Sequence, residues 1–132
     1  MPVLLVYIKS FFRGATVKSV LNFALEIGEK MLKSGGEVNR AEDSVSRIAT
    51  SLGATRADIF ITTSHMTATV FDSNGISYTQ TRRIKGGSTN IEKLHRLNDL
   101  SRRICGGELN LTEAQAELEK IDETANYPTP VT

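Results

Sequence analysis

The chain has 132 residues, 39% of them apolar and 23% charged, with a formal net charge of +1, which is typical of one soluble globular domain. A net charge so close to zero argues against nucleic-acid binding over the whole surface, and no stretch approaches the roughly 18 apolar residues of a membrane span. The lone Cys105 excludes a disulfide framework and a cysteine metal cluster, and favours a reducing, cytoplasmic setting.

Residues 1–17 are apolar and aromatic, apart from Lys9, Arg13 and a few small polar residues. No small-residue cleavage site follows a basic start, so the segment does not resemble a signal peptide. An additional packing element, an interfacial segment and a non-native leader all remain open.

Residues 18–34 carry two adjacent rows of apolar positions at helical spacing, which predict an amphipathic helix. Gly28 lies inside this stripe at a cost of about 1 kcal/mol relative to alanine, which suggests close approach of another backbone. Gly35 and Gly36 can end the helix. A second helix follows over residues 40–52 after a short link, and the two are expected to form an αα-hairpin.

The start of this second helix is rich in charge. Asn39 and Glu42 have the spacing of a capping box, and Gly53 is placed to end the helix. Glu37, Arg40 and Glu42 form a compact polar group. Since helix N-termini favour carboxylates over cations, Arg40 is its unexpected member. Helix capping with a local ion pair is the structural alternative to a functional site.

Three β segments follow, at residues 58–63, 66–71 and 76–84, each rich in β-branched or aromatic residues. Residues 72–75, with Asn74 and Gly75 able to take positive φ, predict a hairpin turn, so we expect a three-stranded antiparallel meander. The many threonines fit the β preference of this residue type on a half-exposed sheet. A hydroxyl-lined surface for a polar ligand is the alternative.

Two further helices are predicted, each with a capping box: Thr89 with Glu92, and Thr112 with Gln115. The apolar positions of the first are Ile91, Leu94, Leu97, Ser101 and Ile104, and those of the second are Ala114, Leu118, Ile121 and Ala125. Gly86-Gly87 before the first lacks a nucleotide-binding pattern. The order ααβββαα predicts an α+β domain over residues 18–126, with two helical hairpins flanking the small sheet. Residues 127–132 are expected to be an extended tail.

Little in the sequence indicates catalysis. Neither His65 nor His95 has a second histidine at ligand spacing, so no metal or cofactor is predicted, and Cys105 is expected to be a small buried residue. Residues 82–103 are mainly basic and residues 108–123 mainly acidic. We interpret them as two solvated helix faces that attract each other, or else as a basic face for an anionic partner.

Several stretches together resemble a known family. SGGEVNRAE (34–42) is followed by the Thr-rich β region, TRRI (81–84), LNDLSRRI (97–104) and GGELNLTEAQAELEKI (106–121). This order resembles the N-terminal cytoplasmic domain of the threonine/serine exporter (ThrE-like) family, over about residues 20–128. The resemblance implies that Glu37, Arg40 and Glu42 match the family signature and that Arg82 and Arg83 match its basic strand end.

The resemblance implies a soluble domain at the cytoplasmic face of the membrane, preceding transmembrane helices that this chain lacks. Its partner would be the membrane-spanning part of the same transporter or of another subunit, with no nucleic acid. We expect a role in assembly, gating or substrate presentation, without enzymatic activity in isolation. The alternatives are a hydrolase-like domain that uses Glu37 or Glu42 as general base, and a homo-oligomerisation module.

The five candidate residues lead to one geometric expectation. Glu37 or Glu42 should pair with Arg82 or Arg83 across the junction of sheet and helix, with Arg40 directed to a cleft. The competing structural interpretation places Arg40 between Glu37 and Asp58.

Overall fold

The computed structural model describes the backbone of residues 2–126 and the side chains of residues 17–123. Over this range the element order is ααβββαα, which confirms the predicted α+β fold class. The elements are α1 (Pro2–Lys33), α2 (Val38–Ser51), β1 (Arg56–Ile61), β2 (His65–Phe71), β3 (Ser77–Arg83), α3 (Ile91–Cys105) and α4 (Leu111–Asn126). The predicted extended tail lies outside the described residues, and the division at residues 17 and 126 stays a prediction.

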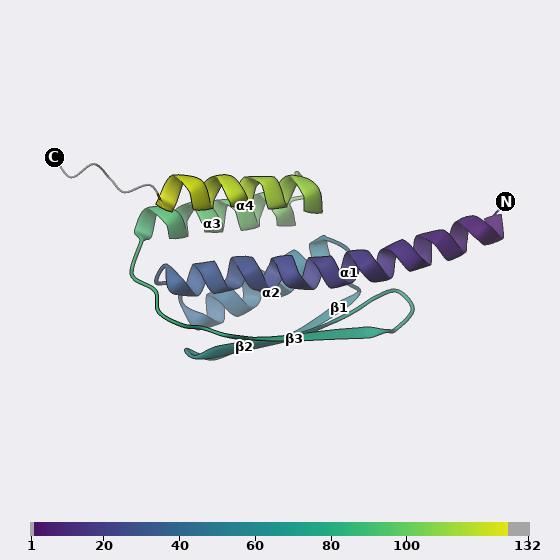
Figure 1. The fold of residues 1–132 in the computed structure, drawn as a ribbon, viewed down its shortest axis with the longest axis horizontal. Helices are drawn as coiled ribbons and strands as arrows, with labels where there is room; N and C mark the ends of the chain where they lie inside the picture. Colours follow the sequence, from purple (N-terminus) through teal and green to yellow (C-terminus); the bar gives the residue numbers. More distant parts are fainter. Residues whose placement is uncertain (1, 127–132) are drawn as a thin grey trace.

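Three layers are stacked in the molecule (Figure 1). The antiparallel sheet, in the order β1-β2-β3, is the predicted meander. One of its faces is covered by α1 and α2, and the α3–α4 hairpin packs on the far side of these two helices (Figure 1). Along β2, Met66, Ala68 and Val70 are buried toward the helices, whereas Thr67 and Thr69 alternate with them on the open face.

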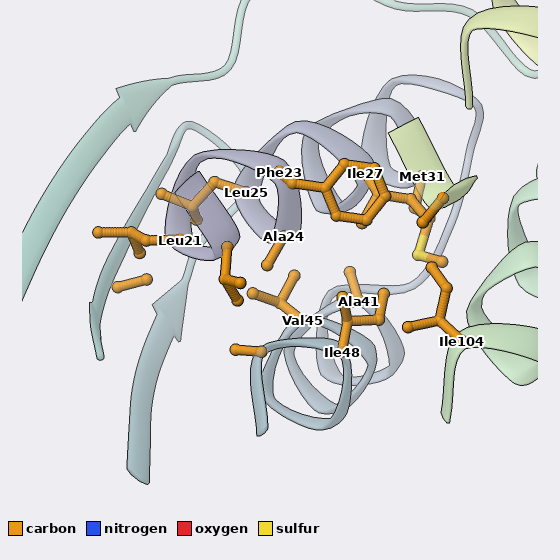
Figure 2. Close-up of a cluster of buried hydrophobic side chains, with 14 of the residues drawn as sticks. Leu21, Phe23, Ala24, Leu25, Ile27, Met31, Ala41, Val45, Ile48 and Ile104 are labelled. Atoms are coloured by element: carbon orange, nitrogen blue, oxygen red, sulfur yellow. The ribbon is translucent and has the colours of Figure 1, made fainter. Parts of the chain in front are cut away.

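The central element is α1, because it contacts α2, β2, β3, α3 and α4. It begins at Pro2, well before the predicted residue 18, and its 32 residues span about 48 Å at 1.5 Å per residue. The side chains of its second half lie at the centre of the hydrophobic core (Figure 2). There, apolar side chains of α1 face those of α2 and α3; the labelled ones are Leu21, Phe23, Ala24, Leu25, Ile27, Met31, Ala41, Val45, Ile48 and Ile104.

Gly28 marks the closest approach in this core. A Cβ on Gly28 would lie 2.4 Å from Val45 Cγ2 and 2.9 Å from Met66 Cε. The expected close approach is therefore present, but it is made by side chains of α2 and β2, and the prediction of a backbone neighbour is wrong. The missing Cβ lets one point of α1 contact the second helix and the sheet together.

The three predicted capping boxes are wrong in register. At α2 the N-cap is Glu37, which makes no side-chain capping bond, so the helix begins before Asn39 can cap it. At α3 the cap is Asn90, whose side chain accepts from the Lys93 amide at 3.0 Å.

At α4 the cap is Asn110. Its Oδ1 accepts from the Glu113 amide at 2.8 Å, while Glu113 Oε1 accepts from the Asn110 amide at 3.0 Å. In α3 and α4 an asparagine one or two residues from the predicted threonine takes the cap position, which agrees with its slightly better capping preference.

Glycines end α1 and α2 as predicted. Gly35 and Gly53 have φ of +100° and +126°, and the Gly36 amide donates to the Met31 carbonyl at 2.8 Å. In the strand turn only Gly75 takes a positive φ. Asn74 does not, because its amide instead donates to the buried Asp72 carboxylate at 2.8 Å.

Two predicted core residues of α3 are exposed. Cys105, predicted to be buried, is exposed, since the preceding Ile104 takes the inward position at the end of the helix. Ile91 is 68% exposed because it stands at the first position of α3, beyond the region that α1 and α2 cover. Within the described residues, no helix is both long enough and apolar enough to cross a bilayer.

The contact at Gly28 can be tested by substitution. Gly28→Ala gains about 1 kcal/mol of helix propensity, but overpacking against the stiff Val45 side chain costs roughly 1–3 kcal/mol. We expect a net loss of about 0–2 kcal/mol in the free energy of unfolding, measured by urea denaturation.

The double variant Gly28→Ala with Val45→Ala supplies the control. Removing Val45 Cγ2 opens the space that the new methyl needs, so the two changes should couple favourably. Additive losses, or a Gly28→Ala protein more stable than the native one, would contradict the packing role of Gly28.

Candidate functional site

The five candidate residues of the sequence analysis do not form one cluster. Glu37 and Arg40 line a pocket at the start of α2, and Glu42 bonds to β1. Arg82 is directed to α1, and Arg83 lies on the exposed side of β3.

Arg82 is bound by three residues of α1. Its Nη1 donates to Glu26 Oε2 at 2.7 Å and to Glu29 Oε1 at 3.3 Å, and its Nη2 donates to Asn22 Oδ1 at 2.7 Å. The predicted pairing of Arg82 with Glu37 or Glu42 is therefore wrong. The physical reason is that β3 runs along α1, whose half-buried positions supply carboxylates within reach of the guanidinium.

The charges on α1 continue into α3 and α4. Lys30 Nζ lies 3.1 Å from Glu26 Oε1 and 3.0 Å from Asp122 Oδ2, and Lys93 Nζ lies 3.3 Å from Asp122 Oδ1. This last contact is an ion pair without hydrogen-bond geometry, since Asp122 Oδ1 accepts no hydrogen bond. The predicted attraction between the basic and acidic segments is thus present in the Lys93 pair. One chain of alternating charges joins β3, α1, α4 and α3.

These contacts shift two pKa values. Burial alone would raise the pKa of the Glu26 carboxyl, but hydrogen bonds from Arg82 and Lys30 and their charges hold it below the ordinary 4.5. Burial alone would lower the pKa of Lys30, but Asp122 and Glu26 hold it above the ordinary 10.5. Both shifts favour the charged forms, so the network holds β3, α1, α4 and α3 together in its ionised state.

Glu42 has a structural partner. Its Oε2 accepts from the backbone N–H of Ile61 at 3.2 Å, at the end of the edge strand β1. The carboxylate therefore joins α2 to the sheet and is already occupied, which weakens its case as a general base. Among the described residues, no group of three or more His, Cys, Asp or Glu side chains is arranged to hold a metal ion.

Arg83 lies on the open side of the sheet. Together with His65 and Thr81 it lines a shallow depression of about 500 Å³. The threonine hydroxyls of this face bond in cross-strand pairs: Thr67 with Thr81 at 3.3 Å and Thr69 with Thr79 at 2.8 Å. These hydroxyls are already hydrogen-bonded within the sheet, as the β-propensity interpretation expects.

Glu37 and Arg40 share a small pocket of about 110 Å³ where the end of α1, the start of α2 and α3 meet. Its other lining residues are Met31, Gly35, Gly36, Ala41, Leu94 and Asn98. Within the described part of the chain, neither Glu37 nor Arg40 forms an ion pair, either with the other or with Arg82, Arg83 or Asp58. Asp58 is held by Arg56 at 3.1 Å instead. The first turn of α2 has no side-chain cap, so its N–H groups remain for a ligand.

The groove between α3 and α4 is larger, at about 460 Å³, but it is a weaker candidate for a binding site. Its charged residues are already paired: Arg96 with Glu92 at 2.9 Å, and Arg103 and Lys120 with Glu117 at 3.9 and 3.7 Å. By contrast, the pocket at the start of α2 combines a cation and a carboxylate that form no ion pair with any described residue, and a helix end without a side-chain cap. It is the better candidate site.

Two features escaped the sequence analysis. Asn98, which lines the pocket, lies in the LNDLSRRI stretch used for the resemblance but was given no role there. The partners of Arg82 lie 53 to 60 positions away in sequence. The only local signal for them was the i,i+4 spacing of Glu26 and Lys30.

The comparisons with known proteins give one match. The model of the family described as "Putative threonine/serine exporter" (ThrE) matches residues 22–132, most of the chain. No curated protein and no solved structure matches significantly.

The bond between Glu42 and Ile61 leads to a prediction that separates structure from catalysis. Glu42→Gln keeps a carbonyl oxygen that can accept from the Ile61 amide, so the free energy of unfolding should stay within about 0.5 kcal/mol of native, whereas Glu42→Ala should lose roughly 1–3 kcal/mol. Urea denaturation measures both. Equal losses in the two variants would show that the charge of Glu42, and not its acceptor oxygen, matters.

The lowered pKa of Glu26 predicts a pH-dependent contribution to stability. Because the folded-state pKa lies below the ordinary 4.5, the stabilisation is fully present above that value and is lost as pH falls through the folded pKa. Glu26→Gln should therefore destabilise the protein most near neutral pH, and the difference from native should vanish in acid. Urea denaturation across the acid range measures this.

Glu92→Gln is the matched control, since Glu92 also pairs with an arginine but is 77% exposed. Its effect should be at most about 1 kcal/mol with little pH dependence. A Glu26→Gln effect as small and as flat would contradict the network.

Proposed function

Because the chain belongs to the threonine/serine exporter (ThrE) family, we propose that it is the cytoplasmic domain of such an exporter and presents the substrate amino acid at the pore mouth. Its partner is then the membrane-spanning part of the same transporter or of another subunit. An exporter moves its solute across a bilayer, and the path is built from spans of about 20 apolar residues each. A domain beside that path can hold the substrate before it enters.

The pocket of Glu37 and Arg40 carries this proposal. A free amino acid has one carboxylate and one ammonium group. The Arg40 guanidinium and the uncapped N–H groups of α2 suit the carboxylate, and Glu37 suits the ammonium. Asn98 adds an amide on the lining that can bond a side-chain hydroxyl. The small volume favours a short side chain such as that of serine or threonine.

The other candidate functions have less support. A hydrolase needs a free general base, but the Glu42 carboxylate is bonded to the Ile61 amide. Glu37 remains available, yet no nucleophile or metal group accompanies it among the described residues.

Arg40→Gln tests the proposal in two settings. In the isolated domain the thermal midpoint should be unchanged or slightly raised, because a cation in the first helical turn opposes the helix dipole by about 0.3–1 kcal/mol. L-Threonine added to the native domain should shift the backbone NMR signals of residues around Gly36, Arg40 and Asn98, and Arg40→Gln should abolish these shifts. In the whole exporter, the same change should lower threonine export at unaltered protein level, because glutamine cannot hold a carboxylate bidentately.

Arg47→Gln is the matched control, since Arg47 is an exposed cation on the same helix and pairs with Asp43 at 3.0 Å. It should leave both the NMR shifts and the export unchanged. A clear drop in melting temperature for Arg40→Gln, with export falling only in proportion to protein abundance, would assign Arg40 to the scaffold. The absence of threonine-induced shifts at the pocket would overturn the presentation role.

A further inference from the structure

The first half of α1 is a charged and apolar extension of the domain. Its N-terminal end runs past the other elements (Figure 1). The family match begins only at residue 22, so this stretch lies outside the matched region. Before Glu26 the chain has no acidic residue, but it has Lys9, Arg13 and Lys18. The segment is therefore cationic, although the chain as a whole is nearly neutral.

Helical periodicity shows that the apolar side of this extension does not continue the core. Phe11 lies about two turns before Lys18 and three turns before Asn22 at 3.6 residues per turn, so these positions share one side of α1. Lys18 and Asn22 are both exposed. By the same spacing, Ile8 and Phe12 share the side of Ser19, which is exposed as well. Ile8, Phe11 and Phe12 thus align with the solvent side of the second half. Leu5 and Tyr7 lie 18 positions, or five turns, before the buried Phe23 and Leu25 and so align with its core side.

The basic positions follow the opposite pattern. Lys9 and Arg13 lie about three and two turns before Val20, which is buried in the core. Over residues 8–16 the apolar side of the helix is therefore opposite to that of the second half, while residues 3–7 are apolar on all sides. The domain packs against one side of the second half.

We propose that the first half of α1 lies in the surface of an anionic membrane. Its apolar positions extend around more than half of the helix, including Tyr7, Phe11 and Phe12, while Lys9 and Arg13 occupy the narrower polar side. This is the pattern of an interfacial helix, whose apolar side sinks into the headgroup region while its cations contact lipid phosphates. Because the basic side of the first half is aligned with the core side of the second half, the rest of the domain lies on the aqueous side of the membrane surface.

A second copy of the chain fits this surface less well. Helices that pair with one another use a narrow apolar seam flanked by charges of both signs. Here the apolar side is broad and the charges are all positive, so two copies would bring like charges together. An anionic lipid surface complements both properties.

Vesicle sedimentation of the full chain tests the proposal. The protein should bind vesicles of phosphatidylglycerol and phosphatidylcholine in equal parts, bind phosphatidylcholine alone much more weakly, and be released by salt. Lys9→Gln with Arg13→Gln should weaken binding to the anionic vesicles by about 25-fold, since each cation near such a surface contributes about a factor of five. Phe11→Ser with Phe12→Ser should weaken binding at any salt concentration.

Arg47→Gln with Arg102→Gln is the matched control, because it removes the same net charge from exposed ion pairs elsewhere. It should leave vesicle binding within about twofold of native, since these cations lie away from the proposed surface. If both charge variants lost vesicle binding equally, the effect would come from net charge alone, and the proposal would be overturned. Self-association without lipid, together with no vesicle binding, would assign the surface to a second copy. None of these outcomes depends on threonine binding, so the result is independent of the presentation role.

Discussion

The packing of α1 at Gly28 is the constraint on which the rest of the fold depends. One missing Cβ lets α1 approach Val45 of α2 and Met66 of β2 at the same point, so a single helix serves as the middle layer. The sheet is then covered on one face only, and the α3–α4 hairpin packs on the helices and not on the sheet. At the end of α1, the loop before α3 approaches just as closely: a Cβ on Gly87 would lie 2.8 Å from the Lys33 carbonyl oxygen. Gly87 is thus explained by packing against α1, whereas Gly86 faces open space and takes a positive φ of +69°.

The sequence was sufficient to predict the element order because the helical and strand periodicities are long and separated by glycine turns. Cap positions were predicted one to two residues off, because asparagine, threonine and acidic residues crowd each helix start, and local spacing cannot choose among them. At α2 the choice is made by tertiary structure, since Glu42 is recruited by the Ile61 amide of β1 and is not free to complete a box. The exposure of Cys105 likewise depends on where the neighbouring layer ends.

The candidate site was predicted only in part, for a related reason. Charges that look alike in the sequence differ in whether the fold supplies a partner. Arg82 meets Glu26 and Glu29 because β3 lies along α1, and no local pattern reveals these pairings across 56 and 53 positions. Glu37 and Arg40 stand at a helix start with no such partner within the described structure, beside a pocket lined by residues from three helices. Whether the fold supplies an ion-pair partner therefore distinguishes charged residues with a structural role from those available to bind a ligand.

The two proposals meet on α1, which is continuous from Pro2 to Lys33. Met31 lines the pocket and Phe11 lies in the proposed membrane segment, so about 30 Å of helix separates them at 1.5 Å per residue. Since the second half of the helix is fixed in the core, the direction of the first half fixes the domain relative to the membrane plane. On the membrane proposal, the positions of Lys9 and Arg13, which align with the core side of the second half, keep the domain body in water while the extension rests in lipid. On the two proposals together, the pocket lies beside the membrane and displaced laterally from the anchor, where a substrate can be held next to a pore in the same bilayer.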